Sequence, residues 1–397
     1  MTNDNKLYDV IVIGAGPAGG QCARELAKAG RKVILLEHSQ EIGQPNYSTA
    51  GTPRETIEEF DLPAKVLSAT WNRIYFASTH EVAEWTYPET RGYVFDFAAL
   101  KKFLAEDAAR HGADTMVGAA ATEFIKEGSN IVGLKYKGIF GEGELRAKYI
   151  VDATGHWGFA NSFLKLNQTQ SDDLASALEL QLSGMPSGFE KTVALYFGKV
   201  APQGYAWIFP MEESRACKIG IGSWGRLPNN TELKQLLRSF MGKFDVSNHL
   251  EPIEIHGGGG FISPGVKYHA YKNIIMIGDA ASQVNPLAFE GIRHAFKTSQ
   301  LAAKCIDQAL KSSTDIVSLE QKYENEWRNL FGWRWNISYR IGKALYRKFT
   351  DEDLDKLMYR FQSVDPADAF EVFFNYRYEL IYKYPKLALL FAKYLSF

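Results

Sequence analysis

A run of glycines near the start of the chain could hold a diphosphate. Residues 14–19 are Gly-Ala-Gly-Pro-Ala-Gly, and an acid, Glu37, follows at roughly the spacing of about 20 residues that dinucleotide sites use. In such a run Gly14 permits a tight turn, Gly16 lets the backbone approach a pyrophosphate, and Gly19 lets a helix pack close to a strand. The start of that helix attracts anions, and the acid can accept hydrogen bonds from a ribose diol. The predicted ligand contacts are Gly14, Gly16, Pro17, Ala18, Gly19 and Glu37.

The segments around this run are those that a dinucleotide site needs. Residues 8–13 (YDVIVI) are a β-branched run typical of a buried parallel strand, GQCARELAKAG has a helical pattern, and KVILLE is a second strand that ends at the acid. The order of strand, glycine turn, helix, strand and acid predicts a Rossmann-type unit. Spacing alone leaves both FAD and NAD open as the nucleotide.

A distant segment, residues 273–303, favours FAD. Its strand IIMIG ends at Gly278-Asp279, and a helix is expected to begin near Gly291. The segment resembles the FAD-dependent p-hydroxybenzoate-hydroxylase-like superfamily, in which the Asp of a GD motif binds the ribityl chain and the next helix points at the flavin pyrimidine ring. A helix N-terminus there would stabilise the negative charge of reduced flavin. The further cofactor contacts that the resemblance implies are Gly155, Gly278, Asp279, Pro286, Gly291 and Ile292.

Residues 202–210, PQGYAWIFP, narrow the resemblance. They look like the GYxWxFP signature of the geranylgeranyl reductase family, which saturates isoprenoid double bonds, and residues 91–114 resemble the strand-then-helix insert of that family. Alternation along a strand puts the aromatic residues on one face, which would serve packing alone or, as in the family, line a substrate cavity. The substrate-lining residues implied in this way are Tyr205, Trp207, Phe209 and Phe289.

Several positions depart from the family pattern. Ala288-Phe289-Glu290-Gly291 stands in place of a glycine-rich turn, and residues 44–51 stand in place of a cysteine-bearing turn. Asp96 occupies the place of an expected arginine, and Thr154-Gly155 the place of the Asp-Gly pair of related hydroxylases. These departures leave the substrate and the electron donor open, while the FAD motifs are intact.

Glu290 and Tyr205 are the candidate catalytic residues. Glu290 sits among Leu287, Ala288 and Phe289, where desolvation is expected to raise the pKa of its carboxyl so that it could give a proton to a substrate. The alternative interpretation makes Glu290 an acid at a helix N-terminus that interacts with the macrodipole. Tyr205, or a water held near either side chain, is another proton source.

The predicted fold class is α/β, with a Rossmann-type FAD-binding domain, an inserted antiparallel-sheet substrate domain and a C-terminal helical region. The FAD domain collects residues 1–70, 97–160 and 265–312, and the substrate domain collects 71–96 and 161–264. The expected strands of the substrate domain are ALELQL, TVALYFG, YAWIFP and CKIGIG. Residues 313–397 have a helical and aromatic pattern.

Composition limits the partners. A net charge of −1 without a basic tract argues against nucleic acid, and three scattered cysteines argue against a disulfide framework or a zinc cluster, so no metal is expected. No secretory signal or membrane-spanning run is evident, which predicts a soluble cytoplasmic protein. The aromatic stretch 370–397 could be an interfacial helix at a membrane or a packed helix, and Pro385 favours the packed one. Monomer and homodimer both stay open.

The run Gly257–Gly260 leads into FISPG, which is no helix start, so no separate NAD(P)H domain is expected. Electrons would come from transient contact with NAD(P)H or a reduced protein carrier. The resemblance predicts an FAD-dependent reductase of C=C bonds in an isoprenoid or other lipid-like substrate. The alternatives are a flavin monooxygenase or halogenase on an aromatic substrate, a redox-neutral carotenoid cyclase, and a flavin-binding protein with a structural or sensory role.

Overall fold

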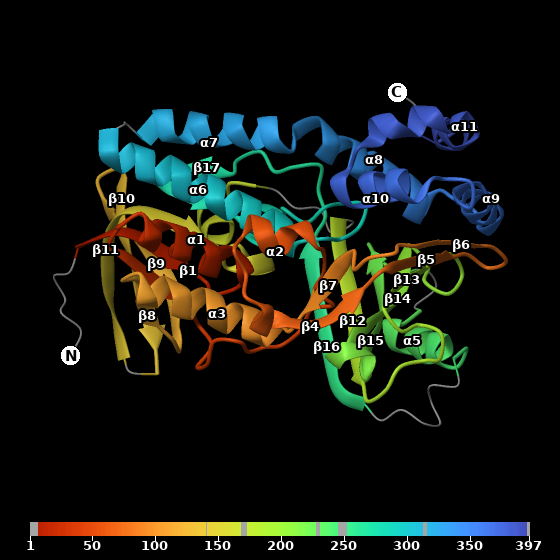
Figure 1. The fold of residues 1–397 in the computed structure, drawn as a ribbon. Helices are drawn as coiled ribbons and strands as arrows, with labels where there is room; N and C mark the ends of the chain where they lie inside the picture. Colours follow the sequence, from red (N-terminus) through yellow and green to blue (C-terminus); the bar gives the residue numbers. More distant parts are fainter. Residues whose placement is uncertain are drawn as a thin grey trace.

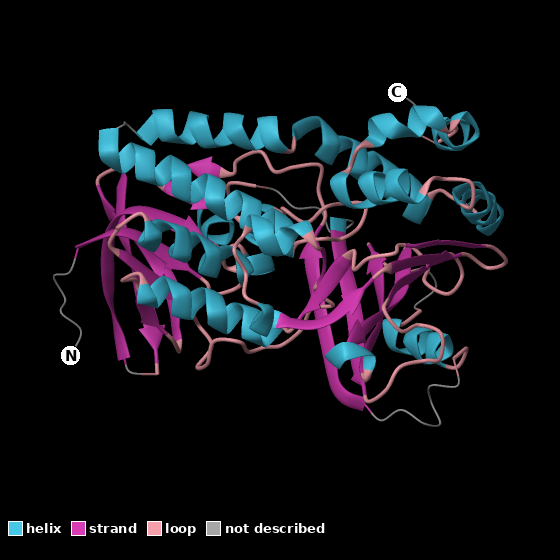
Figure 2. Cartoon of the chain, viewed as in Figure 1, coloured by secondary structure: helices cyan, strands magenta, loops and turns pink. Residues whose placement is uncertain are grey.

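Two large sheets lie side by side, and helices cover both of them on one side (Figure 1). The computed structural model describes residues 7–139, 141–167, 173–227, 231–244, 252–312 and 316–394. Residues 313–315 and 395–397, at the two ends of the predicted C-terminal region, lie outside this set. Figure 2 shows strands gathered into the two sheets with long helices above them, so the predicted α/β class is confirmed.

The first sheet is the Rossmann-type sheet. Its main path runs in the order β17-β18-β11-β1-β2-β8, and β10 and β9 continue antiparallel from β11. The strands are β1 (Leu7–Ile13), β2 (Val33–Leu36), β8 (Asp114–Met116), β9 (Ala119–Glu127), β10 (Asn130–Gly138), β11 (Gly141–Asp152), β17 (Ala270–Tyr271) and β18 (Ile274–Met276). Because β11 pairs in parallel with β1 and with β18, the two distant nucleotide motifs end at the same edge of the sheet.

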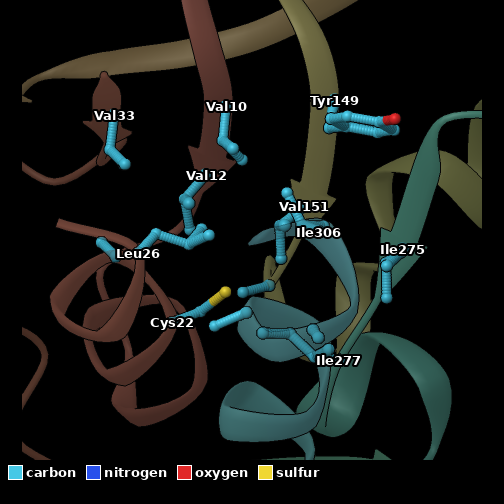
Figure 3. Close-up of a cluster of buried hydrophobic side chains, with 14 of the residues drawn as sticks. Val10, Val12, Cys22, Leu26, Val33, Tyr149, Val151, Ile275, Ile277 and Ile306 are labelled. Atoms are coloured by element: carbon cyan, nitrogen blue, oxygen red, sulfur yellow. The ribbon is translucent and has the colours of Figure 1, made fainter. Parts of the chain in front are cut away.

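Four helices cover this sheet or pack beside it, namely α1 (Pro17–Lys28), α3 (Phe97–Arg110), α6 (Ile292–Ser312) and α7 (Ile316–Leu330). Figure 3 shows Val12 of β1, Cys22 of α1 and Ile306 of α6 directed into one buried cluster, together with Val151 and Ile277. Each of these five side chains is almost entirely removed from water. The hydrophobic effect therefore fixes α1 and α6 against the strands that they follow.

The second sheet is mostly antiparallel, in the order β16-β12-β15-β14-β13-β5-β6. Its strands are β5 (Arg73–Ala77), β6 (Val82–Thr86), β12 (Leu174–Leu182), β13 (Thr192–Tyr196), β14 (Gly204–Met211), β15 (Ala216–Trp224) and β16 (Pro252–Phe261). The four strands predicted from alternation are present as β12, β13, β14 and β15. The glycine run Gly257–Gly260 belongs to β16, so it continues a strand and begins no helix, as expected.

A small third sheet joins the two larger ones. It consists of β3 (Gly51–Pro53), β7 (Gly92–Phe95) and β4 (Leu67–Trp71) in that order. This sheet pairs residues from both sides of the predicted boundary at 70/71, because β4 lies mainly before the boundary and β7 after it. The exact division into domains stays a prediction.

Five further helices pack against the second sheet: α5 (Leu233–Met241), α8 (Gly332–Arg347), α9 (Asp351–Phe361), α10 (Pro366–Asn375) and α11 (Pro385–Ala392). Of the other two, α4 (Phe159–Leu164) packs on β9 of the first sheet, and α2 (Glu55–Glu59) packs beside α3 and α6. The chain end packs on the protein: Phe370, Tyr378, Leu387 and Phe391 are buried in the cluster that α8–α11 share with β5, β6 and β13. Pro385 begins α11. No helix in the described part of the chain combines the length and the apolarity that crossing a bilayer requires.

Candidate active site

One cavity of about 530 Å³ runs from the glycine turn after β1 to the aromatic helices near the chain end. Its walls come from the strand ends of the first sheet, from β12, β14, β15 and β16 of the second sheet, and from α8–α11. Small-molecule sites commonly measure about 300–1,000 Å³. A single space therefore connects the predicted nucleotide contacts with the predicted substrate wall.

The glycine turn has the geometry that its residue types predict. Gly14 has a φ of 96°, a left-handed value that favours glycine. A Cβ on Gly19 would lie 1.8 Å from the carbonyl oxygen of Gly14, so only glycine lets α1 come this close. Gly16 precedes α1, where no side chain caps the helix, and Gly16, Pro17 and Ala18 line the cavity. Free N–H groups at such a helix start suit a diphosphate.

Glu37 holds the glycine turn in place. Its carboxylate accepts hydrogen bonds from the backbone N–H of Ala15 (2.7 Å) and of Ser39 (2.8 Å), and its side chain is 10% exposed. A carboxylate has about four lone-pair sites, so these two bonds and the contact with His38 Nδ1 (2.8 Å) still leave capacity for a further donor. The role of Glu37 toward a ribose stays a prediction.

The second motif meets the first at the cavity. Gly278 has a φ of 61°, and a Cβ there would lie 2.9 Å from the Cβ of Ala18. Asp279, Gly291 and Ile292 line the cavity, and so does Gly155 after β11. No group in the described residues donates a hydrogen bond to the Asp279 carboxylate, and burial raises its pKa. A carboxylate that lacks a partner in a cavity wall suits the hydroxyl chain of a ribityl group.

These residues fit an FAD. The uncapped start of α1 would take the diphosphate, Asp279 the ribityl chain, and the start of α6 the pyrimidine edge of the flavin. Pro286, in contrast, is not among the residues that line the cavity, and its carbonyl oxygen would lie 2.4 Å from a Cβ on Gly342 of α8. Pro286 thus fixes the turn against α8, and its contact with a cofactor stays a prediction.

The aromatic residues lie in the cavity wall, as the alternation of side chains along the strand predicted. Tyr205, Trp207 and Phe209 of β14 line the cavity together with Phe289. The rings of Tyr205 and Phe289 stack with centroids 5.4 Å apart, and the Tyr205 hydroxyl donates to the carbonyl of Ala288 (2.8 Å). Burial and the nearby Glu290 charge raise the pKa of Tyr205 well above its usual value. Tyr205 therefore braces the 288–289 turn with a tightly held proton.

Phe289 has a left-handed backbone, with a φ of 51°. Non-glycine residues adopt this region at an energetic cost, so the surrounding turn must hold it. Asn285 does so: its carbonyl oxygen accepts the N–H of Phe289 (2.9 Å), and its side chain accepts the N–H of Leu287 (2.8 Å). The turn that presents Phe289 to the cavity is thus rigid.

The expectation that burial raises the pKa of Glu290 is wrong. Glu290 lies in the cavity wall at the start of α6, but both carboxylate oxygens contact the Arg293 guanidinium at 2.8 Å, and Tyr376 donates to it at 2.6 Å. Burial alone would raise the pKa, but Arg293 and His294 together hold it well below its usual range. The Glu290 carboxylate is ionised and paired, so it has no proton to give. Arg293 and His294, three and four residues further along the chain, supply the positive charge that the apolar neighbours lack.

Sequence reasoning missed a polar group in the same wall. Glu179 of β12 is 5% exposed and lines the cavity; its Oε2 accepts from Thr49 Oγ1 (2.5 Å) and from Trp207 Nε1 (3.0 Å). Lys218 of β15 is also buried and donates to the carbonyl of Ser48 (2.7 Å). Both residues interrupt apolar strands, ALELQL and CKIGIG, and an acid and a base on neighbouring strands were the available signal.

Sequence reasoning also missed the C-terminal wall. The cavity is also lined by Phe361 of α9, by Phe373 and Phe374 of α10, and by Tyr378 after α10. The departure at Asp96 has a local explanation, because its side chain caps α3 by accepting the N–H of Ala99 (2.9 Å). Asp96 itself is not among the described residues that line the cavity.

Two family models match the chain. Residues 9–157 match the model described as FAD dependent oxidoreductase, and residues 173–260 match the model described as geranylgeranyl reductase catalytic domain. A digeranylgeranylglycerophospholipid reductase of Thermoplasma volcanium is 31% identical over 365 residues, which cover 88% of this chain and 90% of that relative.

Solved structures share the architecture. A geranylgeranyl bacteriochlorophyll reductase-like protein from Thermoplasma acidophilum is 26% identical, with a TM-score of 0.86 over 96% of this chain and 99% of that one. A flavin-dependent brominase is 18% identical, with a TM-score of 0.69 over 90% of this chain and 93% of that one. At that identity the brominase shows a common fold alone.

Proposed function

Because this chain belongs to the geranylgeranyl reductase family of FAD-dependent oxidoreductases, we propose that it reduces C=C bonds of an isoprenoid or similar lipid. It is an FAD-dependent oxidoreductase, as the two nucleotide motifs and PQGYAWIFP predicted. When bound and reduced, FAD supplies a hydride. The residues of the chain itself bind the apolar substrate, orient it and exclude water.

The observation that carries the proposal is the continuous cavity. Its nucleotide end is built from backbone, and its other end is walled by Trp207, Phe209, Phe361 and Phe373. An apolar chain buried there gains about 0.8 kcal/mol per CH₂ before entropy losses. Such a wall offers contact area to an aliphatic alkene and leaves little room for water.

The test is anaerobic. The purified protein is reduced chemically, polyprenyl alcohols and polyprenyl glycerol ethers are added, and flavin reoxidation is followed together with the mass of the lipid product. We expect reoxidation only with the unsaturated lipids and a product heavier by two hydrogens for each double bond. In a parallel aerobic assay, rapid oxygen consumption with an aromatic substrate would point to a monooxygenase, and a bromide- or chloride-dependent product to a halogenase. An isomerised lipid of unchanged mass in the anaerobic assay would point to a cyclase.

We propose that electrons arrive by transient contact with NAD(P)H or with a reduced protein carrier. In support of this, the other glycine-rich run, Gly257–Gly260, forms part of strand β16 and opens no helix. Stopped-flow reduction distinguishes the two donors: a rate that saturates with NADPH or NADH supports direct transfer, and no reduction by either supports a carrier.

We propose peripheral contact with a lipid surface through the end of the chain. Tyr382 and Leu389 are 85% and 70% exposed, and their neighbours Ile381 and Leu387 line the cavity from the same segments. Lys383 and Lys386 flank these side chains and would favour anionic lipid. Co-sedimentation with vesicles that contain anionic lipid should fall clearly in a Tyr382→Ser/Leu389→Ser double variant.

A further inference from the structure

The face of the second sheet that lines the cavity has its smallest side chains on β16, β12 and β15. The register puts Gly258 of β16 beside Ala177 of β12, and Ala177 beside Gly222 of β15. Two residues along the strands, and so on the same face, Gly260 lies beside Ala175. All five residues line the cavity, and we call them the small-residue floor. Because neighbouring strands are about 4.8 Å apart, the floor extends about 10 Å from β16 to β15.

The same face becomes bulky from β14 onward. Tyr205 of β14 lies beside Gly222, and Leu195 of β13 lies beside both Trp207 and Phe76. These four side chains line the cavity too, and the Phe76 ring meets Phe373 of α10 with centroids 4.7 Å apart. The bulky half of the face therefore belongs to the aromatic end of the cavity. The small-residue floor lies at the other end, on the side of the second sheet nearer to the first sheet (Figure 1).

The protein itself does not require glycine at Gly258 and Gly260. Neither residue has a positive φ, and a Cβ on either would meet its nearest protein atom at 3.9 Å, an ordinary contact distance. Gly259 between them differs, because a Cβ there would lie 2.7 Å from the carbonyl oxygen of Ala175. A glycine inside a strand weakens it relative to alanine, and such a glycine often marks the close approach of a ligand to the backbone. Gly258 and Gly260 therefore indicate a ligand above the floor.

Two glycines that the nucleotide motifs predict to contact FAD share this property. Gly16 and Gly291 line the cavity, and neither has a positive φ. A Cβ on Gly16 would meet no protein atom within 4 Å, and one on Gly291 would meet its nearest atom at 3.5 Å. Gly258 and Gly260 thus resemble the glycines expected to face the cofactor.

Two polar side chains border the floor and lack a protein partner on the side of the cavity. The first is the Asp279 carboxylate, whose Oδ2 would lie 3.9 Å from a Cβ on Gly260. The second is His256, the next residue on the same face of β16, whose side chain is 7% exposed and lines the cavity. Its Nε2 contacts Gln181 (3.1 Å) and Glu254 (3.2 Å), and its Nδ1 has no partner in the described residues.

These polar groups indicate which kind of ligand covers the floor. An aliphatic chain would leave the Asp279 carboxylate and the Nδ1 of His256 without hydrogen bonds. A flat heteroaromatic ring with a hydroxylated chain offers partners to both groups and can lie against a surface of glycines and alanines. The flavin part of FAD has this chemistry.

We propose that the small-residue floor carries one face of the isoalloxazine ring of FAD, so that the second sheet supplies part of the cofactor site. The proposal rests on the FAD-binding part of the proposed function and is independent of the identity of the lipid. FAD then connects the two sheets, with its diphosphate on the first and its ring on the second. The bulky half of the same face is left for the apolar substrate.

The central variant is the double substitution Gly258→Ala/Gly260→Ala. Its two methyl groups meet no protein atom closer than 3.9 Å, and alanine loses less backbone freedom than glycine on folding, so the apoprotein should unfold at or slightly above the wild-type temperature. Because the methyl groups take up space that the ring needs, FAD affinity should fall roughly 10- to 100-fold. Thermal unfolding of the apoprotein and FAD titration followed by flavin fluorescence measure the two quantities.

The matched control is Gly332→Ala. Gly332 begins α8, is not among the described residues that line the cavity, and would meet no atom within 4 Å with a Cβ. This variant should bind FAD with wild-type affinity. Hydrogen exchange provides a readout on the wild type: FAD added to the apoprotein should slow amide exchange in β16, one edge strand of the second sheet, more than in β6, the opposite edge strand.

The outcomes separate this proposal from the proposed function. If the wild type binds no FAD, the proposed function fails and the proposal with it. If the wild type binds FAD and the double variant binds it equally tightly, or if β16 and β6 are protected equally, the function stands and the floor does not carry the ring. Weaker binding of a saturated polyprenyl analogue at unchanged FAD affinity would assign the floor to the substrate, and slower reduction by NADPH alone would assign it to the nicotinamide; either result overturns the proposal.

Discussion

The two ends of the cavity recognise ligands in different ways. At the nucleotide end the diphosphate site is made of backbone, namely the turn at Gly14–Gly19 and the uncapped start of α1, and the Asp279 carboxylate adds one side chain. At the substrate end they come from side chains of β12, β14 and β15 and of helices more than a hundred residues further along the chain. A site made of backbone limits which residue types are possible at each position. A site made of side chains limits mainly the combined shape of those side chains.

One ion pair lies where the two ends meet. Glu290 comes two residues before α6 and pairs with Arg293 in its first turn, and Arg293 also donates to the backbone carbonyl of Phe374 and to the side chain of Asn375. Tyr376 completes the link through its hydrogen bond to Glu290. The start of α6 is thus attached to the aromatic wall of α10 by charge and hydrogen bonds.

Arg293→Ala should lower the free energy of unfolding the most, because it removes this link between the two ends of the cavity. The Glu290 carboxylate would stay buried without its partner, which costs about 3–5 kcal/mol. Urea unfolding monitored by circular dichroism measures the change in the free energy of unfolding. Arg54→Ala, at a pair whose side chains are 39% and 76% exposed, should change it by less than about 1 kcal/mol. Equal losses in the two variants would show that the link is not special.

The same ion pair predicts a pH dependence. The pKa of Glu290 is depressed in the folded protein, so its contribution to stability is present above the pKa of the unfolded chain and is lost as the pH falls from there toward the folded pKa. Wild type should therefore lose stability between neutral and acidic pH more steeply than Glu290→Gln. The effect should be smaller than that of Arg293→Ala, because protonation leaves the packing in place. Unfolding curves with parallel pH slopes in both proteins would contradict the depressed pKa.

The contrast between the two ends also explains what the sequence could reveal. Gly14, Gly19 and Gly278 occupy positions where a side chain would clash or where φ is positive, so their identity reports the local backbone directly. Tyr205 and Trp207 were predictable because strand alternation assigns them to one face. Both kinds of inference use information within a few residues of the position concerned.

The surroundings of Glu290 and of Glu179 depend on contacts that are distant in the chain. Glu290 meets Tyr376 across 86 positions, and Glu179 meets Thr49 across 130. The sequence neighbours Leu287, Ala288 and Phe289 suggested an apolar setting for Glu290, but its spatial neighbours include the charged Arg293. Arg293 is only three residues away, at the start of the helix that follows Glu290, and this spacing was the usable signal.

Gly19→Ala and Gly16→Ala test how the nucleotide end of the cavity binds its ligand. The Gly19 variant must move the turn, which should cost about 1–3 kcal/mol of stability and lower FAD affinity. In the Gly16 variant the new methyl group meets no protein atom within 4 Å, so stability should stay within about 0.5 kcal/mol of wild type while FAD affinity falls. Thermal unfolding of the apoprotein and FAD titration measure the two quantities. Undiminished FAD affinity in Gly16→Ala would mean that the diphosphate does not pass over this glycine.

Tyr205→Phe should have the smallest effect and tests the substrate end. It removes one hydrogen bond, from the hydroxyl to the carbonyl of Ala288, and keeps the ring that stacks on Phe289. The loss should be about 0.5–1.5 kcal/mol of stability, with FAD content unchanged. Because burial and the Glu290 charge raise the pKa of Tyr205, its proton is poorly available, and single-turnover reoxidation should slow by less than about tenfold, well short of the loss typical of a removed acid. A loss of a hundredfold or more, with binding of a saturated polyprenyl analogue intact, would instead make Tyr205 the proton donor.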